Sequence, residues 1–270
     1  MLLSAAGTPA ATPIPHGSVQ LVAEYPSLAA GHNLNLGLRF ELEPDWHIYW
    51  RNPGDSGEPP RVQWQLPAGI TAGEMQWPTP QRLGTSSIAD FGYEHAVTLI
   101  VPIHADPNLS VQQAAQLSAQ LSVLVCRDVC IPGKAQLSLI LPIKSPTPTD
   151  KRTSQLFTAA RQSLPQHAPA SWKFRASVAG DSFVLTANVG HQIMHATFFP
   201  LAESQMDNAA PQPVLPTATG FHLTLRKSNQ LFKPLERLKG VLVLDADQAN
   251  TPARGYVIDV PLSNSGAART

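Results

Sequence analysis

The cysteines are the residues whose type and spacing most directly suggest chemistry. The chain has two, Cys126 and Cys130, in the segment CRDVC. A disulfide needs Cα atoms about 4.4–6.8 Å apart, whereas a regular strand rising about 3.3 Å per residue holds these positions roughly 13 Å apart. The segment must therefore turn if the sulfurs are to bond, and Pro132-Gly133 just beyond it allows a hairpin there.

A bond at this spacing would be a weak structural staple. The loop-entropy model gives about 2 kcal/mol for a five-residue ring, against about 4.7 kcal/mol for a ring of 100 residues. Such a short ring suits a bond that opens and closes. The odd positions of residues 117–125 are apolar, so Cys126 is expected to point away from the core, where a thiol is accessible.

Spacing alone leaves three interpretations of the pair open. It is a plain disulfide or two spectator thiols, a redox-active pair, or part of a soft-metal site. In the last case the thiolates, with His47 or Met75, would bind Cu(I). Zinc is disfavoured because the chain has no second cysteine pair and no histidine pair with ligand spacing, although His95 and His104 are available. The Cys-x-x-Cys spacing of thioredoxin-like folds is also absent.

Alternating strands must position this pair. Apolar residues occupy every second position in residues 34–42, 62–66, 117–125 and 137–143, which is typical of half-buried antiparallel strands. The 26 prolines and 17 glycines gather in turn-like clusters between such runs, as at residues 52–57. Many short strands with regular turns favour a β-sandwich.

The domain organisation follows from one break in this pattern. Residues 150–164 read as a helix, with Leu156, Ala159, Ala160 and Ser163 at helical spacing and Pro165 after it. Alternation then resumes, apart from a long proline-rich loop at residues 203–219. We expect a flexible N-terminus (1–17), a first β domain (18–145), a linker with the helix (146–166), a second β-sandwich (167–263) and a flexible C-terminus (264–270).

Composition excludes several classes of function. Lys plus Arg and Asp plus Glu are 19 each, so the net charge is zero and no nucleic acid partner is indicated. No apolar run reaches the roughly 18 residues that cross a bilayer. Residues 1–7 are apolar or small, like the end of an export signal, but no Lys or Arg precedes Arg39, so the positively charged start of such a signal is absent. An ordinary N-terminus is the alternative. Nucleophile-elbow, Walker and dinucleotide-binding patterns are missing from the sequence.

Several motifs together resemble a known family. They are WHIYWRNPGDSG at residues 46–57, WPTP at 77–80, FGY at 91–93, LVC at 124–126 and CIP at 130–132. As a set they resemble the periplasmic N-terminal domain of DsbD-type membrane thiol:disulfide interchange proteins. The closer resemblance is to the copper-sensitivity-suppressor (ScsB-like) branch, in which an extra β domain follows. The likeness over residues 172–262 is looser.

The resemblance implies an all-β chain of two immunoglobulin-like β-sandwich domains joined by a linker with one short helix. It further implies a periplasmic thiol:disulfide oxidoreductase that works as an electron relay without a cofactor. Its partners would be thioredoxin-like redox proteins or domains, a membrane-embedded electron-transfer domain and oxidised periplasmic proteins. Two alternatives stay open: a copper-binding module that uses the same cysteines, and a non-catalytic interaction domain.

The resemblance also assigns site residues. The active pair is Cys126 and Cys130; the cap loop is Asp90, Phe91, Gly92 and Tyr93; and the site is lined by His47, Tyr49, Arg127 and Asp128. DsbD domains separate their cysteines by more residues, so the turn here is tighter. The aromatic order in the cap also differs, which leaves open whether Phe91 or Tyr93 is the lid.

Overall fold

The computed structural model describes residues 10–84, 87–109, 114–145, 147–244 and 254–264. Contacts divide the chain into two compact units. The first consists of the described residues up to Trp50, Gly57–Pro78 and Gly92–Leu164, and the second of Arg51–Ser56, Thr79–Phe91 and the described residues from Pro165 on. Within the described residues, no helix has the length and apolar character that crossing a membrane requires.

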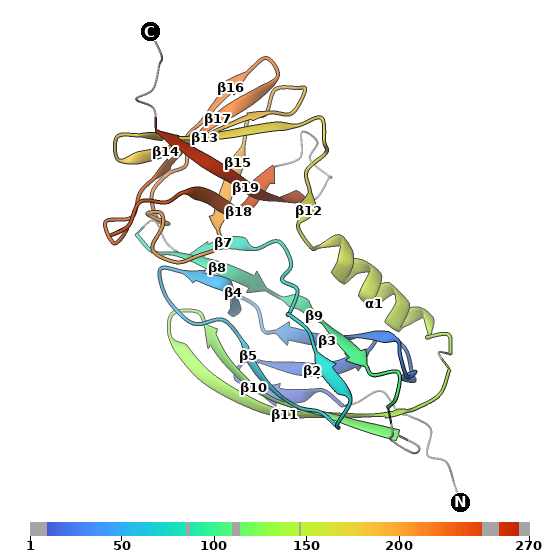
Figure 1. The fold of residues 1–270 in the computed structure, drawn as a ribbon. Coiled ribbons are helices and arrows are strands. Elements are labelled where there is room, and N and C mark those ends of the chain that lie inside the picture. Colours follow the sequence, from blue (N-terminus) through green and yellow to red (C-terminus); the bar gives the residue numbers. More distant parts are fainter. Residues whose placement is uncertain (1–9, 85–86, 110–113, 146, 245–253, 265–270) are drawn as a thin grey trace, which may run out of the picture. The chain divides into compact units, whose positions relative to one another are not determined.

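One sheet of the N-terminal half runs in the order β1-β2-β3-β9-β6 (Figure 1). Its strands are β1 (Thr12–Ile14), β2 (Gly17–Ala23), β3 (Asn33–Leu42), β9 (Ala96–Ala105) and β6 (Ile70–Ala72). In β3 the alternating residues predicted to face the core are buried, from Leu34 to Phe40. The expected flexible N-terminus is wrong for residues 12–17, because β1 pairs with β2 there; residues 1–9 lie outside the described residues.

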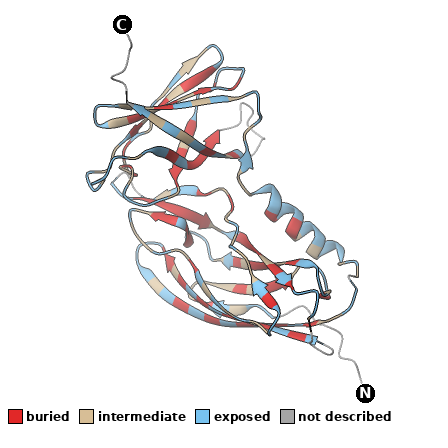
Figure 2. Cartoon of the chain, in the orientation of Figure 1, coloured by how far each residue is buried: buried red, intermediate tan, exposed pale blue. Residues whose placement is uncertain are grey.

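A second sheet carries the cysteines and has the order β11-β10-β4-β8-β7, with β5 also paired to β10. Its strands are β4 (His47–Gly54), β5 (Arg61–Gln65), β7 (Gln81–Gly84), β8 (Ala89–Glu94), β10 (Ala114–Cys126) and β11 (Cys130–Pro142). Buried and exposed residues alternate along most of β10 and β11 (Figure 2). The predicted turn at residues 52–57 is wrong at its start, because β4 continues to Gly54.

The hairpin turn lies between the cysteines and not at the proline. Pro132 and Gly133 sit inside β11, opposite Leu124 and Val123. Proline lacks the backbone N–H that a central strand donates to its neighbour. Strand β11 is an edge strand of its sheet, where that loss is tolerated. The turn predicted at Pro132-Gly133 therefore lies a few residues too far along the chain, because the hairpin turns between Cys126 and Cys130.

The predicted helix is present as α1 (Lys151–Gln162) and packs on the first unit. Asp150 caps its N-terminus by accepting from the Thr153 N–H at 3.0 Å; this bond is the first cause that lowers the pKa of Asp150. Phe157 is fully buried. Its ring packs against Gly37 of β3, where an added Cβ would lie 3.3 Å from Phe157 Cζ. The expected helical face missed Phe157 and included Ala159, which is exposed.

The second unit is an all-β body in which one strand joins two layers. Strand β19 (Arg254–Asn264) pairs with β18 (Arg237–Leu244) up to Pro261 and then with β13 (Lys173–Ala179) from Leu262. The other strands are β12 (Gln166–His167), β14 (Ser182–Asn188), β15 (Ala196–Pro200), β16 (Val214–Thr217) and β17 (Gly220–Arg226). Buried side chains from β14, β15, β17 and β18 form the core.

The fold class is confirmed as all-β and immunoglobulin-like. Within the second unit, the long loop predicted at residues 203–219 is partly wrong, since Val214–Thr217 pairs with β17. Of the predicted C-terminus, residue 264 ends β19, and residues 265–270, like residue 146 of the linker, lie outside the described residues.

Candidate redox site

A disulfide joins Cys126 and Cys130 at the closed end of the β10–β11 hairpin, next to its turn. The two residues are directly opposite in the strand register, with a Cα–Cα distance of 4.1 Å and an S–S bond of 2.03 Å. Residues 127–129 form the turn, in which the Arg127 N–H donates to the Val129 carbonyl at 3.1 Å. The tight hairpin thus brings together the sulfurs that a continuous strand would hold apart.

The two sulfur-bearing residues differ sharply in exposure. Cys126 is 1% exposed, whereas Cys130 is exposed, as are the three turn residues. The expectation that Cys126 is accessible is therefore wrong. The side chain of Cys126 points to the opposite face of the sheet from Val125, as alternation predicts. That face is also covered at this position, because Cys126 pairs with His47 of β4 and residues 47–50 are all buried.

His47 and Tyr49 lie on the same side of the sheet as the disulfide. His47 is opposite Cys126 in the register, and alternation returns Tyr49 to the same face. Their rings meet edge to face with centroids 5.1 Å apart. The Tyr49 hydroxyl is 3.5 Å from Cys130 Sγ, within hydrogen-bonding distance for sulfur. Two of the four residues assigned as site-lining, His47 and Tyr49, are thus brought to the cysteine pair.

Gly57 holds Tyr49 in place, and sequence reasoning did not single it out. Its φ of +78° belongs to the left-handed region, and a Cβ there would lie 2.0 Å from Tyr49 Cζ. The backbone of residue 57 therefore lies directly against the phenol ring. The only sequence signal for this contact is the glycine at the end of the WHIYWRNPGDSG motif.

The charges of the turn are largely compensated locally. Arg127 Nε is 3.0 Å from Asp128 Oδ2, and the guanidinium lies over the Trp46 ring at 5.0 Å. Trp46 also stacks on His16, with centroids 3.7 Å apart. Arg127 and Asp128 therefore fix the turn against its aromatic neighbour, a contact that their sequence positions did not predict.

The segment assigned as a cap loop is a strand. Asp90, Phe91, Gly92 and Tyr93 are buried within β8, and β4 separates β8 from β10 in the sheet order. An extended backbone is required here because β8 pairs within the sheet, and a Cβ on Gly92 would lie 2.2 Å from the Ile48 carbonyl oxygen. The loop assignment is thus wrong, and a capping role for these residues stays a prediction.

Each polar or aromatic member of this segment has a packing partner. Phe91 meets Phe199 edge to face at 5.0 Å, and Asp90 Oδ1 accepts from the Ser56 N–H at 3.1 Å. The Tyr93 hydroxyl donates to the Pro78 carbonyl at 2.8 Å. Burial raises the pKa of Tyr93 well above its ordinary value.

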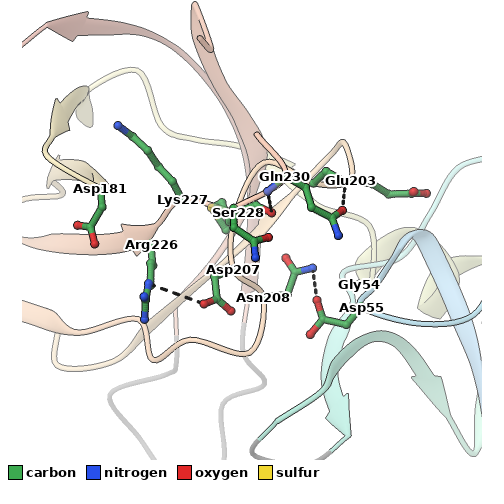
Figure 3. A pocket seen from close by; sticks show the side chains of 13 residues that line it. Gly54, Asp55, Asp181, Glu203, Asp207, Asn208, Arg226, Lys227, Ser228 and Gln230 are labelled. Atoms are coloured by element: carbon green, nitrogen blue, oxygen red, sulfur yellow. Dashed lines mark hydrogen bonds and ion pairs between the residues drawn. The ribbon is translucent and has the colours of Figure 1, made fainter. Parts of the chain in front are cut away.

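The second unit contains a polar pocket of about 620 Å³ (Figure 3). Asn208 donates to Asp55 Oδ1 at 2.9 Å, and Arg226 Nε lies 3.9 Å from Asp207 Oδ2. The described residues that line it include neither cysteine nor histidine. Its side chains offer hydrogen bonds and charges but no group for thiol exchange. Among the described residues of the whole chain, no cluster of three or more His, Cys, Asp or Glu is arranged to hold a metal ion.

Comparisons with known proteins bear on residues 18–142 and on the fold. The family model for the N-terminal domain of the thiol:disulfide interchange protein DsbD matches residues 18–142. The crystal structure of the N-terminal periplasmic domain of ScsB from Proteus mirabilis has a TM-score of 0.70 at 18% identity, covering 96% of this chain and 100% of that one. That likeness shows a shared fold.

Other comparisons add little. A structure of a protein of unknown function from Porphyromonas gingivalis W83 aligns over 90% of this chain and 99% of that one, with 11% identity and a TM-score of 0.26. No curated protein sequence matches the chain significantly.

The matched segment contains the whole hairpin that bears the disulfide, and its cysteines are those that the motifs assigned as the active pair. Residues 18–142 therefore match the family of N-terminal domains of DsbD-type thiol:disulfide interchange proteins.

Proposed function

We propose that this chain is a thiol:disulfide oxidoreductase that relays electrons through reversible opening of the Cys126–Cys130 bond. The observation that carries the proposal is the asymmetry of the pair: an exposed Cys130 is bonded to a buried Cys126 at the tip of a hairpin. An attacking thiolate needs access to one sulfur only, and the other sulfur must stay close enough to close the ring again.

Reduction proceeds in two exchanges. A partner thiolate attacks Cys130 Sγ, the intramolecular S–S bond breaks, and its electron pair leaves on Cys126 Sγ, which takes up a proton. The partner's second thiolate then attacks its own first sulfur and releases Cys130 as a thiolate, so that two electrons have moved to this chain and the partner holds the disulfide. Attack by Cys130 on an oxidised protein, followed by closure from Cys126, passes them on.

Tyr49 is suited to assist at the exposed sulfur. Its O–H, 3.5 Å from Cys130 Sγ, can donate to the thiolate that forms when Cys130 is released. Hydrogen bonds to ionised groups are stronger than those between neutral groups. Tyr49 would therefore favour the thiolate form of Cys130, which is both the leaving group in reduction and the nucleophile in the onward step.

The partners follow from the family. DsbD-type relays imply a thioredoxin-like donor recharged by a membrane-embedded domain, and oxidised proteins as acceptors. The similar Proteus structure is a periplasmic domain, which supports a periplasmic location for this chain. A compartment outside the cytoplasm also permits a disulfide to persist between turnovers.

The test is to trap the mixed disulfide. Oxidised chain is mixed with a reduced thioredoxin whose resolving cysteine has been replaced, and the linkage is mapped by mass spectrometry. We expect attachment at Cys130, with Cys126 recovered as a free thiol. The variant Cys126→Ala should still form a mixed disulfide with oxidised thioredoxin, whereas Cys130→Ala should do so much more slowly.

Two results would contradict the proposal. One is a wild-type disulfide that reduced thioredoxin leaves intact, which would make the bond structural. The other is attachment at Cys126, which would reverse the assigned roles. Circular dichroism of both variants provides the control that the fold is retained.

A further inference from the structure

A groove of about 210 Å³ lies beside the disulfide, and all of its lining residues belong to the first unit. It crosses the β10–β11 hairpin and extends to the segment that leads into β5. Residues that matter for its chemistry are Ser122, Leu124, Pro132, Lys134, Glu58 and Arg61. No step of the exchange reaction described above uses it.

Strand register places the groove and the sulfurs on one face of the hairpin. The paired residues are Cys126 with Cys130, Leu124 with Pro132, and Ser122 with Lys134. Side chains two residues apart on a strand point to the same side, so these three rows share a face. At about 3.4 Å per residue, successive rows are about 7 Å apart.

The second row is the apolar part of the groove. Leu124 is half-buried and Pro132 is exposed, so the row presents hydrocarbon surface that a partner could cover. Val129 at the tip of the turn, 61% exposed, adds apolar surface on the other side of the disulfide. Covering such surface is favourable in proportion to its area.

The third row is cationic. Arg61 is opposite Ser122 in the β5–β10 register, and its guanidinium lies 3.4 Å from Glu58. Lys134, on the other side of Ser122, has no ion pair or hydrogen bond among the described residues. This row therefore carries a net positive charge that faces solvent.

We propose that the groove binds the segment flanking the reactive cysteine of the thioredoxin-like partner. The inference rests on the proposed function and adds a recognition pattern to it. The partner segment runs extended along the hairpin, with its cysteine at Cys130. It presents an apolar side chain two positions before the cysteine and a carboxylate four positions before it, which match the rows at about 7 Å and 14 Å.

Two short thiol peptides test this pattern. One has the sequence Glu-Ser-Leu-Ser-Cys and the other Lys-Ser-Ser-Ser-Cys, both with blocked ends. The measured quantity is the rate at which each reduces the oxidised chain at low salt. Each rate is divided by that peptide's rate with a small aromatic disulfide, which removes intrinsic differences in thiol reactivity. Dithiothreitol serves as a reductant that cannot use the groove.

We expect the Leu/Glu peptide to react about fivefold faster, as one exposed ion pair and one apolar contact would give. Lys134→Glu should abolish or reverse the preference, with the Lys peptide gaining rate. Leu124→Ser should reduce it, and Lys151→Glu on α1, the matched charge control, should leave it unchanged. Reduction by dithiothreitol should be the same in all variants.

The outcomes separate the groove from the exchange chemistry. Equal peptide rates with normal reduction by dithiothreitol overturn the groove and leave the proposed function standing. A preference that survives Lys134→Glu also overturns it. A disulfide that neither thioredoxin nor dithiothreitol reduces overturns the proposed function, and the groove inference with it.

Discussion

At the scale of single residues, the site depends on how Tyr49 is held. Tyr49 is fully buried, yet its hydroxyl reaches the exposed cysteine. The contact that fixes its ring is the backbone of Gly57, which approaches so closely that no side chain fits between them. One glycine therefore serves both a turn with positive φ and the placement of the phenol.

Gly57→Ala should destabilise the first unit by at least about 2 kcal/mol, because strain at positive φ is added to a clash in a packed core. Urea unfolding measures this effect. Gly31→Ala is the matched control: its φ is +72°, but a Cβ there makes only ordinary contacts with Pro107 at 3.6 Å. A Gly57 variant no less stable than the Gly31 variant would show that the ring is not held in this way.

At the scale of elements, the sequence predicted most strands, because period-two alternation is a local signal. The core faces of β3, β10 and β11 are as expected. Three features were not predictable: the position of the hairpin turn at residues 127–129, the burial of Cys126, and the strand at Asp90–Tyr93. Each depends on what a neighbouring strand covers. Asn52, for example, donates to the Pro200 carbonyl at 2.8 Å across 148 positions, a contact without any local sequence signal.

Phe157→Ala tests whether α1 is part of the first unit or a detachable linker. Phe157 is fully buried, so its removal should cost about 3–5 kcal/mol in the unfolding free energy of that unit. Urea unfolding of the variant and of Gln155→Ala, an exposed position on the same helix, provides the comparison. A loss similar to that of the exposed control would mean that the helix docks weakly.

At the scale of the whole molecule, we expect the two units to unfold in separate transitions, so that no single free energy of unfolding describes the chain. The tryptophans separate them. Of the five in the chain, Trp46, Trp50, Trp64 and Trp77 belong to the first unit and Trp172 to the second. Fluorescence of a Trp172→Phe variant therefore reports unfolding of the first unit alone, and this variant is the background for the pH experiment.

Alkaline pH should weaken the first unit through Tyr93. Burial raises the pKa of this phenol above its ordinary value of 10.0, so above about pH 10 the unfolded chain loses a proton that the folded chain keeps. The free energy of unfolding therefore keeps its full contribution from Tyr93 below about pH 10. It falls as pH rises toward the pKa of the folded state, by up to about 1.4 kcal/mol per pH unit for one proton.

Urea midpoints of the Trp172→Phe background between pH 8 and about pH 11 measure this pH dependence. Tyr93→Phe should flatten it, whereas Tyr25→Phe, at a partly exposed position (38%), should not. A slope unchanged by Tyr93→Phe would assign the alkaline transition to other groups.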